Sequence, residues 1–269
     1  ILGLSATVNR GTKYLIGDKV LTKGELLDKI APVCFTYGID ESMSKGTSRK
    51  LDVYVIQHKL DSKNKTIEAG NAKKRFYQTE LAAYQYWDAR HKKSWYITDN
   101  EKKELQIRIT STKRSRILYN LESKIEPVKK LLSHLKDKTI IFGNSLSALE
   151  KVTPNVVSSN NSDDENKRIR EDFDKGRIKV IGSFKKLKQG ANLNDLDNII
   201  IMSYYSTEKD LIQRLGRLRH KEKRGKVFIF VTQNTQEEVW FTKMFENIDT
   251  FNMIYCPNVE FVINKINND

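Results

Sequence analysis

The sequence has 269 residues, of which 48 are Lys or Arg and 34 are Asp or Glu, so its formal net charge is +14. This length suffices for one large or two small domains with real cores. The cationic excess favours nucleic acid as a partner, because each phosphate that Lys or Arg neutralises releases counterions. Two cysteines, Cys34 and Cys256, are too few for a disulfide framework or a cysteine zinc site, so we expect reduced thiols. Apolar runs are short and no signal-like segment starts the chain, so we expect a soluble cytoplasmic protein without membrane spans.

The first half of the chain predicts a strand, a loop and then a helix. Leu51–Leu60 alternates enough to be a strand, and the polar stretch Asp61–Ala72 predicts a loop. The helix that follows carries an aromatic stripe, which could stack on bases, although helical spacing favours packing in a core. The stripe consists of Tyr77, Leu81, Tyr84 and Trp87.

A second helical stretch, Glu101–Leu135, concentrates basic residues just before Ile117. They bind phosphates or form a solvated face beside an apolar stripe, and the sequence leaves both readings open. These basic residues are Arg108, Lys113, Arg114 and Arg116.

The rest of the chain alternates between short apolar runs and helical patterns. Strands are predicted near residues 139–143, 155–158, 179–183, 198–202 and 226–231. Such alternation predicts an α/β fold, in which helices cover both faces of a parallel sheet. Ligands bind such sheets at the carboxyl ends of the strands, where Asn144, Ser145 and the loop 183–194 fall. We interpret Asp163-Asp164-Glu165-Asn166 as a helix N-terminal cap and Asp40-Glu41-Ser42-Met43 as a helix start.

The octapeptide Gln213–His220 predicts a helix with one apolar and one cationic side. At about 100° per residue, Leu211, Ile212, Leu215 and Leu218 form the apolar stripe, while Gln213, Arg214, Arg217 and His220 point to the other side. The cationic side suits a nucleotide triphosphate. Taken by itself, the octapeptide fits an amphipathic helix with a solvated basic face equally well.

Four segments together resemble motifs III, IV, V and VI of superfamily 2 nucleic-acid helicases and translocases, in that order. Within this superfamily the chain is similar to phage-type DNA helicases, in which QRLGR follows a segment like Ser203-Tyr204-Tyr205-Ser206. The resemblance covers residues 1 to about 245. The four segments are Gly3–Thr7, Thr139–Ser145, Ser183–Asn194 and Gln213–His220.

The resemblance implies two RecA-like domains that close on ATP. Residues 1–50 would be the tail of the first domain and a hinge, with Val33–Tyr37 as its last strand. Residues 51–269 would be the second RecA-like domain, a parallel sheet with helices on both faces and a helical insertion at about 61–115.

The resemblance also implies which residues contact ATP. Arg217 matches the arginine finger, whose planar and permanently charged guanidinium stabilises charge on the transferring γ-phosphoryl. Gln213 and Arg214 match its motif partners. His220 stands where the family usually has a second arginine, so the sequence does not assign a second arginine finger. Two further residues, Gly190 and Asn192, match the nucleotide residues of motif V, although a structural turn could use them as well.

For nucleic acid, the resemblance implies contacts that hold phosphates without reading bases. Ser5 and Thr7 resemble the motif III residues that couple the nucleotide site to nucleic acid. The nucleic-acid contacts are Asn144 and Ser145 of motif IV and Ser183, Lys185 and Lys186 of motif V.

The sequence contains no G-x-x-x-x-G-K-[ST] phosphate loop. We therefore expect a fragment whose Mg²⁺ ligands lie in a missing N-terminal domain and which alone hydrolyses no ATP. Two hypotheses follow. The chain is the second motor domain of an ATP-driven helicase or translocase, with DNA as the favoured track. Alternatively, it is a basic nucleic-acid-binding module without turnover, or the motor subunit of a restriction system.

Overall fold

The computed structural model describes residues 13–16, 19–30, 41, 45, 49–71, 73–184, 196–204, 215, 218, 223–246 and 252–268. The predicted strand Val33–Tyr37 and most of the predicted hinge lie outside these residues. No helix within the described part is long and apolar enough to span a lipid bilayer.

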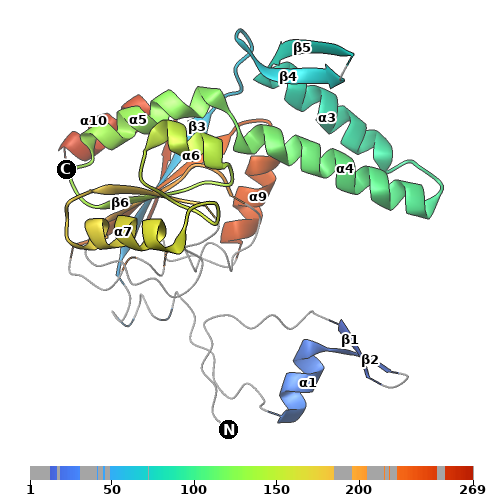
Figure 1. Cartoon of the computed structure of the whole chain (residues 1–269), viewed down its shortest axis with the longest axis horizontal. Coiled ribbons are helices and arrows are strands. Elements are labelled where there is room, and N and C mark those ends of the chain that lie inside the picture. The colour runs from blue at the N-terminus through green and yellow to red at the C-terminus, as the bar shows by residue number, and fades with distance from the viewer. Residues whose placement is uncertain are drawn as a thin grey trace.

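The main sheet has seven strands among the described residues, all of them parallel (Figure 1). Their spatial order is β11-β3-β10-β9-β6-β8-β7, so strands distant in sequence lie side by side. The strands are β3 (Leu51–His58), β6 (Thr139–Phe142), β7 (Val156–Val157), β8 (Val180–Ser183), β9 (Asn198–Ile201), β10 (Gly225–Thr232) and β11 (Asn252–Cys256). The prediction of a parallel sheet is confirmed, including the strands that the sequence places in it.

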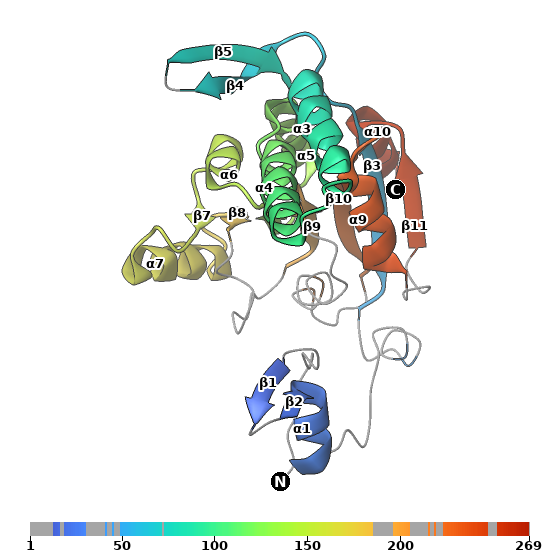
Figure 2. The same cartoon turned by 90° about the vertical axis from the view of Figure 1, so that its right-hand side faces the viewer.

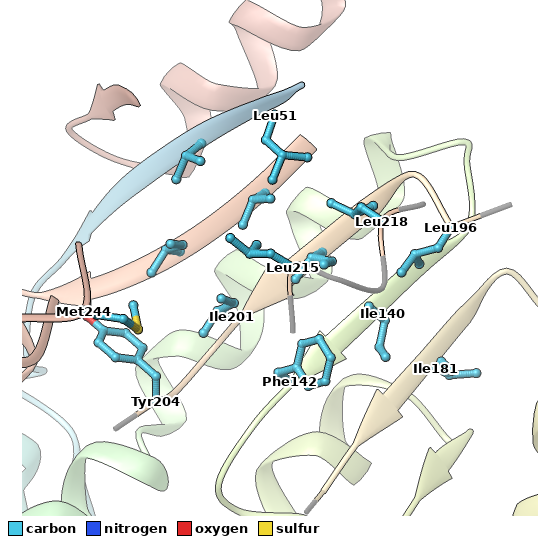
Figure 3. Close-up of a cluster of buried hydrophobic side chains, with 14 of the residues drawn as sticks. Leu51, Ile140, Phe142, Ile181, Leu196, Ile201, Tyr204, Leu215, Leu218 and Met244 are labelled. Atoms are coloured by element: carbon cyan, nitrogen blue, oxygen red, sulfur yellow. The ribbon is translucent and has the colours of Figure 1, made fainter. Parts of the chain in front are cut away.

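Helices cover both faces of the sheet because its central strands are apolar on both sides. Ile140 and Ile141 are adjacent in β6 and are both fully buried, each in a different hydrophobic cluster. One cluster includes α7 (Asp163–Asp174) and α9 (Gln236–Phe245). The other includes α5 (Ile125–His134), α6 (Leu146–Val152) and α10 (Val259–Asn268). Figure 3 shows the first cluster, in which side chains of β6, β8 and β9 spread over one face of the sheet and Met244 lies beside Tyr204.

The helix α7 begins as its sequence predicts. Its first turn is Asp163-Asp164-Glu165, and the side chain of Ser162 accepts the Glu165 N–H at 3.1 Å. The carboxylates stabilise the positive end of the helix dipole. The acidic cluster is therefore a helix start, as interpreted.

An insertion between β3 and α5 contains two strands and two long helices (Figure 2). Its elements are β4 (Lys65–Asn71), β5 (Lys74–Thr79), α3 (Glu80–Ser94), α4 (Asn100–Tyr119) and the short 3₁₀ helix η1 (Glu122–Lys124). It has a small core of its own, formed by Ala83, Tyr84, Ile117, Leu118 and Leu121. The insertion therefore carries a separate hydrophobic cluster beside the two of the sheet.

The prediction of a loop at Asp61–Ala72 is wrong, because most of this stretch forms β4, which pairs antiparallel with β5. The insertion is therefore not wholly helical. A tight turn closes the hairpin: Gly70 has a φ of +103°, and the Asn71 side chain accepts the N–H groups of Lys73 and Lys74. The strands lack an apolar pattern because both lie mostly in solvent, so periodicity could not reveal them.

The aromatic stripe is divided between two elements. Tyr77 belongs to β5 and is exposed, so it does not share a helix face with the others. Tyr84 and Trp87 pack in the core of the insertion. Core packing, the preferred interpretation, is confirmed for Tyr84, which is only 5% exposed.

The long helix predicted over Glu101–Leu135 is interrupted. It ends at Tyr119, where the Asn120 side chain donates to the Arg116 carbonyl at 2.7 Å. The chain then turns through η1 before α5 begins at Ile125. The Asn120 side chain thus caps the end of α4, and the apolar periodicity of the sequence contains no sign of this end.

Near the other end of the chain, β1 (Lys13–Ile16) and β2 (Lys19–Thr22) form an antiparallel hairpin that leads into α1 (Lys23–Ile30). Thr22 and Glu25 form a reciprocal cap, in which the Glu25 N–H donates to Thr22 Oγ1 and the Thr22 N–H donates to Glu25 Oε2. These contacts fix the start of α1 locally.

Candidate nucleic-acid interface

Three of the candidate nucleic-acid residues lie together at the carboxyl edge of the sheet. Asn144 and Ser145 follow β6, and Ser183 ends β8. The two strands pair in parallel with Phe142 opposite Ser183, and the Gly143 N–H donates to the Ser183 carbonyl at 3.4 Å. Adjacent parallel strands thus bring together residues that are about 40 positions apart in sequence.

The position of α6 behind this edge depends on Gly143. A Cβ atom at residue 143 would come within 3.0 Å of the Leu149 side chain, so glycine allows α6 to pack closely against the strand end. Ser145 caps the helix, because its Oγ accepts the Ala148 N–H at 3.3 Å. The strand end and the helix start therefore form one rigid corner.

The Ser145 hydroxyl is already engaged within the protein. It is buried, and it donates to Asn120 Oδ1 at 2.5 Å. Asn120 follows α4, so this bond ties the insertion to the carboxyl edge of the sheet. Ser145 thus positions the edge, and a direct phosphate contact by its hydroxyl stays a prediction.

The side chain of Asn144 carries a hydrogen-bond donor without a partner in the described part of the chain. Its backbone N–H donates to Ser203 Oγ at 2.7 Å, but its side-chain Nδ2 is buried and has no hydrogen-bond partner among the residues that the structure describes. A buried donor without an acceptor costs about 1–3 kcal/mol. An acceptor from a ligand, such as a phosphate oxygen, would remove that cost.

A buried ion pair lies beside this edge. Lys124 Nζ is 2.7 Å from Glu237 Oε2, and their side chains are 1% and 0% exposed. Lys124 also donates to the Met202 carbonyl, and Glu237 accepts the Thr232 N–H. These bonds join η1 and α9 to the ends of β9 and β10. The pair therefore locks the helix layer onto the carboxyl edge.

A second polar cluster fixes the base of the insertion. Both oxygens of the buried Glu80 carboxylate accept bonds, from the Asp61 N–H and from the N–H and hydroxyl of Ser123. Since the Ser123 hydroxyl donates to Glu80, it accepts from His58 Nε2 at 2.8 Å. Burial lowers the pKa of His58 to about 3, with a smaller contribution from the Lys124 charge. His58 is therefore neutral at pH 7.

The other candidate site residues lie outside the described residues. They are Arg217, Gln213, Arg214 and His220 of motif VI, Gly190, Asn192, Lys185 and Lys186 of motif V, and Ser5 and Thr7 of motif III. Two leucines of the predicted basic helix are described, and both are buried: Leu215 is 2% and Leu218 is 6% exposed (Figure 3). Both belong to the sheet cluster, so the predicted apolar assignment is confirmed for these two residues.

The basic residues before Ile117 behave differently from one another. Arg114 is buried and pairs with Asp88 at 2.6 Å, so it does not belong to a solvent-facing phosphate site. Its partner lies 26 positions away on α3, which no pattern in α4 could reveal. The remaining three, Arg108, Lys113 and Arg116, are exposed.

Two residues of the edge escaped the residue-level prediction. Ser203 follows β9 as Asn144 follows β6, so the rule that selected Asn144 could have selected Ser203 as well. Asn120 has no such signal, because it reaches Ser145 only through the tertiary placement of α4.

Residues 123–222 match the family model described as the helicase conserved C-terminal domain. The matched segment is 100 of the 269 residues. It begins in η1 and includes β6, β8 and β9, so the candidate edge at Asn144, Ser145 and Ser183 lies inside it. This match agrees with the resemblance to helicases seen in the sequence.

Curated relatives are similar over parts of the chain. The DNA 3'-5' translocase XPB2 of Sulfurisphaera tokodaii is 30% identical over 127 residues, which is 45% of this chain and 29% of that protein. The ATP-dependent helicase Lhr-Core of Methanocaldococcus jannaschii is 28% identical over 164 residues, or 53% of this chain and 18% of that protein. The mitochondrial ATP-dependent RNA helicase MRH4 of Debaryomyces hansenii is 33% identical over 67 residues, or 25% and 11%. The chain thus spans less than a third of the length of these relatives.

Solved structures are similar at low sequence identity. The C-terminal domain of the DEAD-box protein Dbp5 has a TM-score of 0.49 and 15% identity, covering 56% of this chain and 93% of that one. The C-terminal part of the Fun30 ATPase domain has a TM-score of 0.49 and 14% identity, covering 73% and 90%.

Proposed function

We propose that this chain supplies the second motor domain, residues 51–269, of an ATP-dependent nucleic-acid helicase or translocase. In this proposal ATP binding closes two RecA-like lobes, and the carboxyl edge of the sheet holds part of the nucleic-acid track. We propose DNA as the track. The relative of Sulfurisphaera tokodaii, which is named for DNA, matches 45% of this chain, whereas the MRH4 relative, which is named for RNA, matches 25%.

The observation that carries the proposal is the unpartnered buried donor of Asn144 within a helicase C-terminal domain. Ser183 and Ser203 lie at the ends of the two neighbouring strands, so Asn144 belongs to an edge with several small polar groups. Uncharged donors of this kind position a phosphate backbone without reading bases. Sequence-independent binding suits a motor that moves along a track.

ATP hydrolysis is assigned to residues outside the described part. When bound, ATP with Mg²⁺ would supply the γ-phosphoryl group that is transferred to water. The proposed finger is Arg217, with Gln213 and Arg214 beside it, and Gly190 and Asn192 approach the nucleotide. The burial of Leu215 and Leu218 supports this assignment, since it leaves the other side of the predicted helix for the cations.

The test is steady-state ATPase of the protein that contains this chain together with a phosphate-loop domain, at saturating DNA. Arg217→Ala should lower turnover by about 10³-fold or more and leave DNA affinity nearly unchanged, because the finger acts on the transition state. His220→Ala serves as the neighbouring control and should lose far less. Near-normal turnover of Arg217→Ala, or equal losses in both variants, would refute the assignment.

The chain by itself should bind nucleic acid and hydrolyse no ATP. Its affinity should fall steeply with salt, because released counterions dominate such binding. ATP hydrolysis by the chain alone would contradict the proposal that hydrolysis needs both RecA-like domains. Binding without any nucleic-acid-stimulated ATPase in the longer protein would favour the alternative, a binding module without turnover.

A further inference from the structure

We propose that a groove between α3 and α4 is a second nucleic-acid contact, which carries a bound strand from the carboxyl edge of the sheet outward along the insertion. The inference rests on the proposed function for the identity of the ligand, and it does not depend on ATP hydrolysis. We call this surface the insertion groove. The residues that line it include Tyr86, Arg90, Lys93, Lys102, Gln106 and Thr110.

The insertion concentrates the positive charge of the chain. Residues 59–120 contain 15 Lys and Arg against 7 Asp and Glu, an excess of eight, while the whole chain has an excess of 14. Two of the acidic residues are already engaged, since Glu80 is buried and Asp88 pairs with Lys92 and Arg114. More than half of the excess charge therefore lies on less than a quarter of the chain.

The cations of the groove lie beside aromatic rings. The Arg90 guanidinium carbon is 5.5 Å from the ring centroid of Tyr86 and 5.8 Å from that of Trp87. On the opposite helix, Lys113 Nζ is 5.8 Å from the Trp87 ring. Tyr86 is 49% exposed, so its ring is open to a base. Cations that follow a backbone and rings that stack on bases are the two elements of sequence-tolerant single-strand binding.

The groove has the size and charge for such a strand. Its volume is about 710 Å³, and no carboxylate is among the residues that line it. Among described residues, Arg90, Lys93 and Lys113 make no ion pair. Arg90 and Lys93 of α3 line the hollow together with Lys102 of α4, and Lys113 lies further along α4 toward the sheet. A solvated basic helix would spread its cations around its surface, whereas the lining cations come to one hollow from two helices.

One side of α4 connects the groove to the sheet. Lys102, Gln106, Ile109, Lys113, Arg116 and Asn120 recur every three or four residues, so they follow one side of the helix. At the sheet end, Asn120 accepts the Ser145 hydroxyl next to Asn144. Figure 1 shows α3 and α4 extending side by side from the sheet. The 20 residues of α4 are about 30 Å long, so the surface extends well beyond the edge of the sheet.

The insertion is held in place at its base, which fixes the direction of this surface. Glu80 bonds to both Asp61 and Ser123, and the Tyr84 hydroxyl accepts the Gln236 N–H of α9 at 2.7 Å. A strand that leaves Asn144 along α4 therefore meets the groove without a change in the fold.

The test compares two triple variants of the chain, each of which replaces one arginine and two lysines by glutamine. The groove variant is R90Q/K93Q/K113Q. The control is K167Q/R168Q/K265Q on α7 and α10, where all three side chains are exposed. Affinity for a fluorescent 20-nucleotide single strand of DNA is measured across a salt series. Thermal unfolding confirms that both variants fold like the parent chain.

The groove variant should raise Kd by about 10-fold or more at low salt and reduce the salt slope by about 2, because about three phosphate contacts are lost. The control should change Kd by no more than about 2-fold, since it alters the overall charge equally without removing a contact. Equal losses in the two variants, with the parent chain binding normally, would overturn the groove and leave the proposed function standing. A parent chain that binds no nucleic acid at low salt would overturn both.

Discussion

The sheet and the insertion are stabilised in different ways. All four residues of β6 and of β9 are buried, and apolar side chains fill both faces of the sheet. The insertion has a small apolar core and depends on buried polar contacts at its base, around Glu80 and the Arg114–Asp88 pair. Apolar burial is non-directional, whereas buried polar groups require one geometry. The sheet is thus expected to provide stability, and the polar contacts to provide the orientation of the insertion.

The largest expected effect comes from the ion pair that joins the two regions. Lys124→Met leaves the Glu237 carboxylate buried and uncompensated, which should lower the free energy of unfolding by about 3–5 kcal/mol. The double variant K124M/E237Q should recover much of this loss, because the neutral amide can still accept the Thr232 N–H. Urea denaturation of the three proteins measures both effects. A double variant as unstable as Lys124→Met would show that packing of the lysine stem matters more than its charge.

The second-largest effect on stability should be confined to the insertion. Glu80→Ala removes the acceptor for Asp61 and for both donors of Ser123, which should cost about 2–3 kcal/mol. Hydrogen exchange in the native state should show lost protection in β5 and α3, with little change in β6 and β9. Uniform loss of protection in both regions would contradict the division between orientation and stability.

A pH dependence should originate at the same junction. The pKa of His58 is about 3 in the folded chain and 6.5 in its ordinary state, so the unfolded chain takes up the proton first as pH falls. The contribution of His58 is fully present above pH 6.5 and is lost between pH 6.5 and 3, which amounts to about 2 kcal/mol at pH 5. Unfolding free energies at pH 7.5 and pH 5 test this. His58→Gln should reduce the difference, and an unchanged pH dependence would rule His58 out as its source.

The smallest expected effect is at the joint between α4 and the carboxyl edge. Asn120→Ala removes one acceptor from the buried Ser145 hydroxyl, but Asn120 itself is exposed, so stability should fall by only about 0.5–1.5 kcal/mol. Ser147→Ala is the neighbouring comparison, because it removes a longer bond to Asn120, at 3.4 Å, and a 3.1 Å contact with the Ser145 hydroxyl, while the Ser145–Asn120 bond stays. Thermal unfolding compares the two variants, and an equal or larger loss for Ser147→Ala would place the joint elsewhere.

The sequence predicted the sheet and its edge better than the insertion. Short apolar runs between helical patterns identified β6, β8, β9 and β10, and the parallel arrangement implied that Asn144 and Ser183 share an edge. The hairpin β4–β5 was missed because its strands are mostly exposed and its turn depends on Gly70. Arg114 could not be separated from its exposed neighbours, because its partner Asp88 lies on another helix.

The sequence by itself determined the α/β architecture, the resemblance to helicase motifs and the cationic character of the chain. Each of these follows from local periodicity, from motifs or from composition, which need no knowledge of distant neighbours. Tertiary structure alone decided which polar groups are engaged. Ser145 is tied to Asn120, Lys124 is tied to Glu237, and Asn144 keeps a free donor. The reason is that burial and pairing depend on residues that meet only when the chain has folded.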